Sequence, residues 1–103
     1  MQQGNYGSAE NMLQTVLQMD AGNVQAHVDL GDIRQKQADE QRGSNPSATS
    51  VAKLKRAKAL YEEAKAHYAR ALSDPGLRGY ANSKTEYVDK QLVVVNKELF
   101  VRE

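Results

Sequence analysis

The chain contains no cysteine and no tryptophan, and among its 103 residues there are only two prolines and one phenylalanine. Without cysteine, disulfide frameworks, thiolate metal sites and cysteine nucleophiles are excluded. Aromatic residues make up 6% of the chain, which is too few for an ordinary β-sandwich. Pro46 and Pro75 both lie in short polar stretches, so we expect loops there and helices elsewhere.

Long apolar runs and one-sided charge are also missing. No apolar run approaches 18 residues, so we expect no membrane-spanning helix. The first residues lack the basic start and apolar stretch of a signal peptide. A chain without cysteine suits the cytosol, so a cytoplasmic location is slightly favoured, and a targeting signal upstream of Met1 is left open. The net charge of +1 gives no general attraction for nucleic acid.

Charge is nevertheless unevenly distributed along the chain. Residues 1–40 hold six acidic and two basic side chains, whereas residues 51–72 hold six basic and two acidic ones. The simpler interpretation is that these segments are neighbouring helices whose outer faces attract each other weakly. The alternative is that they form two surfaces for two partners.

Apolar residues recur three and four positions apart along four segments, which predicts four helices. We expect them at about 6–19, from 24 to beyond 38, at about 48–72 and at about 77–101. Asn5 and Asn23 are suitable N-caps for the first two. The last segment becomes apolar around most of its circumference near its end, so one neighbouring helix cannot cover it.

A set of five residues recurs within the chain. Every member of the second set lies 55 positions after its counterpart: Tyr6, Ala9, Leu13, Val16 and Leu17 match Tyr61, Ala64, Tyr68, Ala71 and Leu72. Each set is followed by an acidic residue and a turn, at residues 20–22 and 74–76. Between the two sets lies a further helical segment with His27, Leu30 and Gly31.

With these offsets the chain resembles the tetratricopeptide repeat (TPR) family, whose unit has 34 residues in two antiparallel helices, A and B. Residues 4–20 look like a B helix with its exit turn, and residues 61–75 look like the next B helix. Residues 27–34 look like the A helix between them, with His27 where the family usually has Trp. The resemblance covers about half the chain.

The resemblance implies one all-α domain of about four antiparallel helices in TPR-like helix-turn-helix stacking. It divides the chain into residues 1–22, helix B of a truncated repeat; residues 23–75, a full repeat with an insertion at about 39–60; and residues 76–103, an atypical closing helix. The insertion predicts that the second and third helices project as a long hairpin with residues 43–48 at its tip. Because repeat units stack to bury their apolar faces, the first helix lacks its usual cover. We expect either a fragment of a longer protein or an oligomer.

No catalytic constellation is visible, so we expect a protein that is not an enzyme and that has neither cofactor nor metal. His27 lies on an apolar helix side and is interpreted as a packing histidine. His67 has Glu63 one turn before it, but a metal site needs three or four convergent ligands. Residues 43–47 lack the lysine and the preceding strand of a phosphate-binding loop.

The predicted function is a non-catalytic protein–protein interaction module, a scaffold or adaptor segment that binds a protein or peptide. The resemblance implies a partner groove on the second helix, lined by Gln25, Val28, Asp29, Asp32, Gln35 and Lys36. The two carboxylates would repel a terminal carboxylate, so a partner with Lys or Arg near Asp32 fits better. The alternative is that these residues are only a hydrated helix face.

Three other functions stay open. Self-association would give a homo-oligomer through Leu13, Val94, Leu99 and Phe100. Nucleic-acid or anionic-surface binding would use Lys53, Lys55, Arg56 and Lys58. No stacking aromatic residues interleave with these basic side chains, which argues against nucleic acid as the partner. As an accessory domain of a larger enzyme, the chain would leave the chemistry to other residues.

Overall fold

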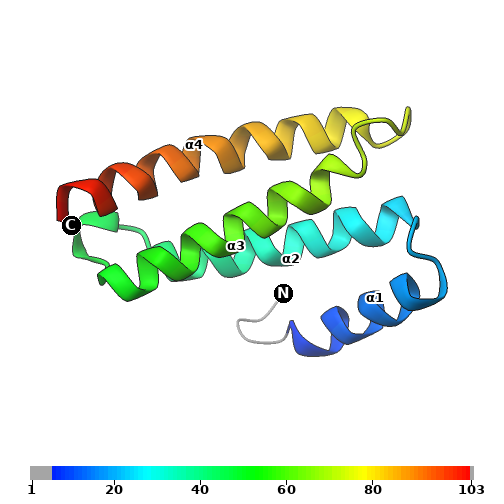
Figure 1. The fold of residues 1–103 in the computed structure, drawn as a ribbon, viewed down its shortest axis with the longest axis horizontal. Helices are drawn as coiled ribbons and strands as arrows, with labels where there is room; N and C mark the ends of the chain where they lie inside the picture. The colour runs from blue at the N-terminus through cyan, green and yellow to red at the C-terminus, as the bar shows by residue number, and fades with distance from the viewer. Residues whose placement is uncertain (1–5, 103) are drawn as a thin grey trace.

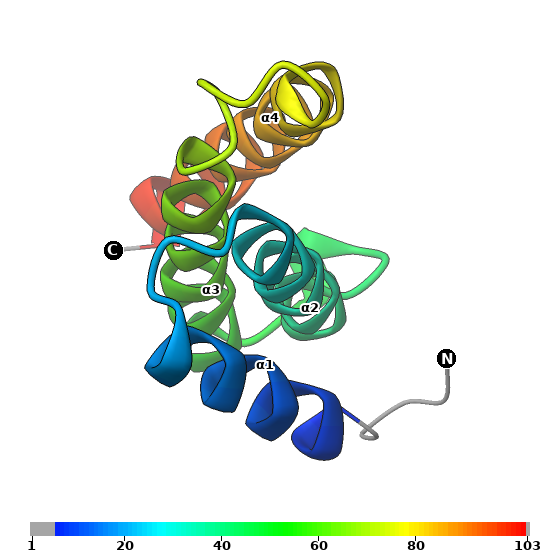
Figure 2. The same cartoon turned by 90° about the vertical axis from the view of Figure 1, so that its right-hand side faces the viewer.

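The computed structural model describes residues 6–102, which form four α-helices, one short 3₁₀-helix and no strand. The elements are α1 (Gly7–Met19), α2 (Val24–Arg42), η1 (Pro46–Ala48), α3 (Val51–Ala69) and α4 (Arg78–Arg102). The predicted all-α fold is confirmed. Helices α2, α3 and α4 run side by side in alternating directions, and α1 lies on the far side of α2 and α3 from α4 (Figure 1 and Figure 2).

Local capping sets most helix ends. The Asn23 side chain accepts a hydrogen bond from the backbone N–H of Ala26 at 2.9 Å, and Ser50 accepts one from Lys53 at 3.2 Å. Because Ser50 caps α3, this helix begins at Val51, later than the expected residue 48. Gly43 ends α2 with φ of +74°, a conformation that favours glycine. Asn5 lies outside the described residues.

Helix α3 supplies the centre of the core. One stripe of it is completely buried, as the three- and four-residue spacing predicts: Leu54, Ala57, Tyr61, Ala64 and Tyr68. Helix α2 packs on one side of this stripe and α4 on the other (Figure 2). On α4, Ala81, Val88 and Val95 are buried seven residues apart, so this helix faces α3 along most of its length.

The α2/α3 hairpin does not project, and that expectation was wrong. Helix α4 runs along the whole hairpin, and Arg102 donates hydrogen bonds to the carbonyl oxygens of Thr49, Pro46 and Ser47 at the tip (2.6, 2.6 and 3.0 Å). The insertion therefore lengthens the helical body, because the 25-residue α4 is long enough to cover it.

Two carboxylates of α2 tie the three long helices together. Asp32 accepts hydrogen bonds from the hydroxyls of Tyr68 on α3 (2.6 Å) and Tyr80 on α4 (2.8 and 2.9 Å). One heptad further along, Asp39 accepts from Tyr61 on α3 and from Tyr87 on α4 (2.9 Å). We call these four hydrogen-bonded pairs the Asp–Tyr ladder.

The ladder tyrosines stay protonated donors. Burial and the hydrogen bond to Asp32 raise the pKa of Tyr80 to about 12. Burial, together with a bond to Asp39 or Asp32, raises the pKa of Tyr61 and Tyr68 further. The ladder therefore persists at neutral and moderately alkaline pH.

The close approach of α2 to α3 requires glycine at position 31. A Cβ atom there would lie 2.8 Å from Cε1 of Tyr68. The Tyr68 ring is fully buried and its hydroxyl is bonded to Asp32, so it has little room to move.

We predict that Gly31→Ala lowers the free energy of unfolding by about 1–3 kcal/mol, because overpacking outweighs the gain in helix propensity. Gly79→Ala is the matched control, since no heavy atom lies within 4 Å of a Cβ at that position. It should be neutral or stabilising by up to about 1 kcal/mol. Urea denaturation followed by circular dichroism measures both, and similar changes for the two variants would contradict the packing argument.

Candidate partner-binding groove

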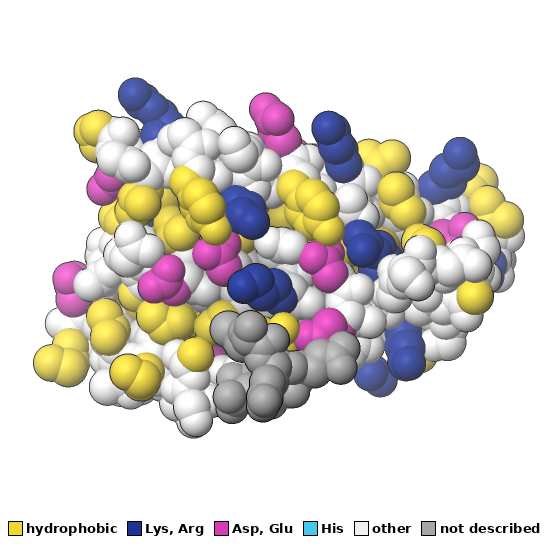
Figure 3. All heavy atoms as spheres, turned by 180° about the vertical axis from the view of Figure 1, so that it is seen from behind, with side chains coloured by type: hydrophobic (Ala, Val, Ile, Leu, Met, Phe, Trp, Pro, Cys, Tyr) yellow, Lys and Arg dark blue, Asp and Glu magenta, His cyan; other side chains and the backbone are white. Residues whose placement is uncertain are grey.

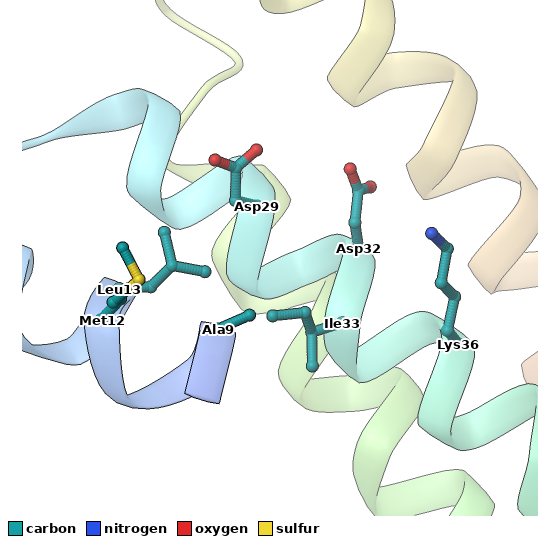
Figure 4. Close-up of a pocket in the computed structure, with 7 residues that line it drawn as sticks. All are labelled: Ala9, Met12, Leu13, Asp29, Asp32, Ile33 and Lys36. Atoms are coloured by element: carbon teal, nitrogen blue, oxygen red, sulfur yellow. The ribbon is translucent and has the colours of Figure 1, made fainter. Parts of the chain in front are cut away.

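A groove of about 350 Å³ lies between α1 and α2. Seven residues line it: Ala9, Met12, Leu13, Asp29, Asp32, Ile33 and Lys36. Figure 4 shows Ala9 and Ile33 pointing toward each other across the floor, while Asp29, Asp32 and Lys36 stand along α2. We call this feature the α1/α2 groove. Its floor is apolar and its α2 side carries charges of both signs.

Seen from the α2 side, the charged residues of this helix form a band between hydrophobic side chains on either side (Figure 3). The largest exposed apolar side chains on α1 are Met12 (71% exposed) and Met19. Exposed apolar surface beside fixed charges is the arrangement that partner proteins use for affinity and orientation.

An ion-pair network fixes α1 on α2. Arg34 pairs with Glu10 of α1 at 2.6 Å and with Glu63 of α3 at 2.7 Å. The hydrogen bond from Arg34 lowers the pKa of Glu10 below its ordinary value. Tyr6 also donates its hydroxyl to Glu40 at 2.7 Å. The α1/α2 groove is therefore held at a defined width by contacts outside it.

Four of the six predicted groove residues come together on the outer side of α2. Asp29, Asp32 and Lys36 line the α1/α2 groove, and Gln25 donates to Asp29 at 2.9 Å. The carboxylate of Asp32 is already bonded to Tyr68 and Tyr80, which leaves Asp29 as the more available acid.

The other two predicted groove residues are corrected by the structure. Val28 is 2% exposed and belongs to the core. Gln35 is 7% exposed, donates to Asp39 at 2.6 Å and accepts from Lys84 of α4 at 3.4 Å. Neither residue lines the groove, because neighbouring helices cover both side chains.

Sequence reasoning missed Ala9, Met12 and Ile33 as groove residues. Met12 was detectable, because it lies next to Leu13 of the repeated set and occupies the position equivalent to His67. An apolar residue at position 12, with no further helix to cover it, indicates an exposed apolar face on α1.

The residues predicted for self-association do not form one surface. Leu13 of α1 lines the α1/α2 groove, whereas Val94 and Phe100 are exposed on α4. Helices α1 and α4 lie on opposite sides of α2 and α3 (Figure 2). Leu99 is 5% exposed and packs in the core, so its assignment was wrong. The apolar end of α4 does keep exposed side chains, with Phe100 at 84%.

The predicted basic surface lies on α3. Lys53, Lys55 and Arg56 are exposed and Lys58 is half-buried. Among residues 6–102, no group of three or more His, Cys, Asp or Glu side chains could hold a metal ion. Over the same residues, no helix is long and apolar enough to cross a membrane.

A histidine pair joins the start of α2 to the end of α3. His27 Nε2–H donates to the carbonyl oxygen of Ala21 at 3.0 Å, so the neutral ring has a bare Nδ1. The Nδ1 atoms of His27 and His67 are 3.1 Å apart, and His67 is then the donor.

We predict that the stability of the protein falls as the pH drops below about 6.5. Burial, His27, Arg34 and Arg70 lower the pKa of His67, with Glu63 acting in the opposite direction. The unfolded chain therefore binds protons first, so the contribution of neutral His67 is complete above its unfolded pKa and is lost on acidification toward the lower folded pKa.

Thermal unfolding between pH 5.5 and 7.5 measures this dependence, and His67→Gln is the control. Glutamine keeps a donor for His27 but does not titrate, so its melting temperature should vary less over this range. An unchanged slope in His67→Gln would show that other groups cause the pH dependence.

Comparison with protein-family models, with curated proteins and with solved structures found no match for this chain. The TPR resemblance therefore stays a prediction from the residues quoted above. The functional argument rests on the geometry of the α1/α2 groove.

Proposed function

We propose that this chain is a TPR-like, non-catalytic protein–protein interaction module that holds a partner polypeptide in the α1/α2 groove. One observation carries the proposal: a hollow of about 350 Å³ has an apolar floor and a charged side, and it lies on a helical frame. Such grooves suit recognition by side-chain contacts on a preformed surface.

The lining offers both affinity and orientation. Met12, Leu13 and Ile33 provide apolar contact, and the flexible side chain of Met12 adapts to different partner surfaces. Asp29 and Lys36 lie two turns apart on α2 with opposite charges, so a bound segment with matching charges is favoured in one direction.

The frame supports the proposal because it keeps the groove in place without a partner. The Asp–Tyr ladder positions α2, and Arg34 connects α1, α2 and α3. A partner then loses less free energy to ordering the protein than it would with a flexible site.

Self-association is a second candidate function, favoured by the exposed apolar end of α4. Val93 and Val94 are exposed there, and Phe100 and Val101 are exposed two helical turns later. Contact between two such ends would bury them without using the α1/α2 groove.

We predict that a photo-reactive side chain in place of Met12 gives discrete protein adducts in cell extract. The same side chain in place of Ala59, which is exposed on α3, is the control and should give few. Electrophoresis and mass spectrometry identify the adducts. Nuclease-sensitive adducts concentrated at position 59, near the basic residues, would favour nucleic-acid binding and contradict the proposal.

A further inference from the structure

The 55-residue repeat extends to the contacts between helices. Glu10 of α1 pairs with Arg34 of α2 at 2.6 Å, and Lys65 of α3 pairs with Asp89 of α4 at 2.8 Å. Residues 65 and 89 lie 55 positions after residues 10 and 34, so the same ion pair recurs with its charges reversed.

Buried positions repeat in the same way. Ala26 and Ile33 of α2 match Ala81 and Val88 of α4 at the same offset, and all four are buried. The pairs α1/α2 and α3/α4 therefore carry equivalent residues at these contact positions, as two copies of one repeat unit would.

The second copy has a helix in the place where the first copy has a groove. Helix α2 lies against both α3 and α4 (Figure 2). The groove residues Met12 and Leu13 correspond to His67 and Tyr68. On α3, His67 contacts His27 at 3.1 Å, and Tyr68 bonds Asp32 at 2.6 Å.

The α2 side of the groove matches as well. Asp29, Asp32 and Lys36 correspond in order to Lys84, Tyr87 and Gln91 of α4. All three α4 residues bond to α2: Lys84 to Gln35 at 3.4 Å, Tyr87 to Asp39 at 2.9 Å, and Gln91 to Arg42.

Exposure shows the difference between the copies. Ala64 and Tyr68 are fully buried beneath α2, whereas their counterparts Ala9 and Leu13 are half-buried and line the groove. The α1/α2 groove is thus the uncovered equivalent of the surface that α2 covers.

We propose that the α1/α2 groove binds an amphipathic helix of a partner protein, antiparallel to α1, in the way that α2 packs on α3 and α4. This inference rests on the proposed function and specifies its partner. The apolar face of the partner helix would contact Ala9, Leu13 and Ile33, with a small residue where α2 has Gly31.

The charges of the groove specify the polar side chains of the partner helix. Lys84 donates a hydrogen bond to Gln35 of α2. The groove residue equivalent to Lys84 is Asp29, whose carboxylate accepts hydrogen bonds. The partner helix therefore carries Lys or Arg at the position equivalent to 35. Gln91 accepts from Arg42, but its counterpart Lys36 donates, so the partner carries an acid seven residues later. A basic residue followed by an acid at i+7 therefore defines the fitting helix.

A second copy of this chain fits poorly. Its α2 is held in its own fold by the Asp–Tyr ladder. Its α4 exposes Lys90 and Lys97, which are seven residues apart but both basic, so one of them would face Lys36 with the same charge.

The test uses a labelled synthetic peptide as the probe. It has the sequence of residues 23–42 with Gln35→Lys, Asp39→Asn and Arg42→Glu; Asn at 39 offers a donor to Asp32 of the groove. The control peptide has Gln35→Glu, Asp39→Asn and Arg42→Lys, with the same composition and the charge order reversed. Fluorescence anisotropy with the intact chain at low salt should give about tenfold tighter binding of the probe.

A charge-swapped protein provides the matched arm. Asp29→Lys combined with Lys36→Glu should reverse the preference, so that the control peptide binds about tenfold more tightly. Position 36 is exposed and 29 half-buried, and circular dichroism checks that the variant is folded.

Equal binding of the two peptides, or a preference that the swap leaves unchanged, would overturn the inference. A second result would also overturn it. If light scattering gives the free protein a mass above the 11.4 kDa of one chain, and Met12→Glu makes it monomeric, a second copy fills the groove. Protein adducts at position 12 without charge-ordered peptide binding would leave the proposed function standing and remove only the helical partner.

Discussion

The rest of the structure depends on two aspartates of α2 that each bond a tyrosine from α3 and one from α4. A hydrogen bond to a charged group contributes about 1.5–3 kcal/mol, so the four bonded pairs are a substantial share of the stability of a small domain. Their seven-residue spacing on all three helices also fixes the register. With α2 held in this way, its remaining side faces α1 and forms one wall of the α1/α2 groove.

The repeat explains why one chain contains both a filled and an open version of the same site. Residues at equivalent positions kept their packing role, as Ala26, Ala81, Ile33 and Val88 show. At other equivalent positions the charges are reversed, since the pair Glu10–Arg34 recurs as Lys65–Asp89. A site that keeps its shape but changes its polar groups retains a preference for a helix while selecting a different sequence for it.

Periodicity predicted the four helices and the buried stripe of α3, because the apolar spacing follows the helical repeat. It could not predict which neighbour covers a polar face. Val28 and Gln35 were assigned to the groove although other helices bury them, and Leu99 was assigned to an exposed surface. The bonds of Tyr80 to Asp32 and of Tyr87 to Asp39 could not be predicted either, because they depend on the path of α4 in space. The charge-reversed ion pairs could not be predicted from the repeat. The repeat was identified from positions that share a residue type, whereas the paired positions carry opposite charges.

The central claim is that α1 is the uncovered counterpart of α3. Amide hydrogen exchange on the free chain tests it most directly, because exchange reports local opening. The account predicts that amides of α3 between Ala64 and Tyr68 exchange only with global unfolding, and that those of α1 between Ala9 and Leu13 exchange about a hundredfold faster or more. Equal protection of the two segments would show that α1 is already covered or stable by itself, and would contradict the account.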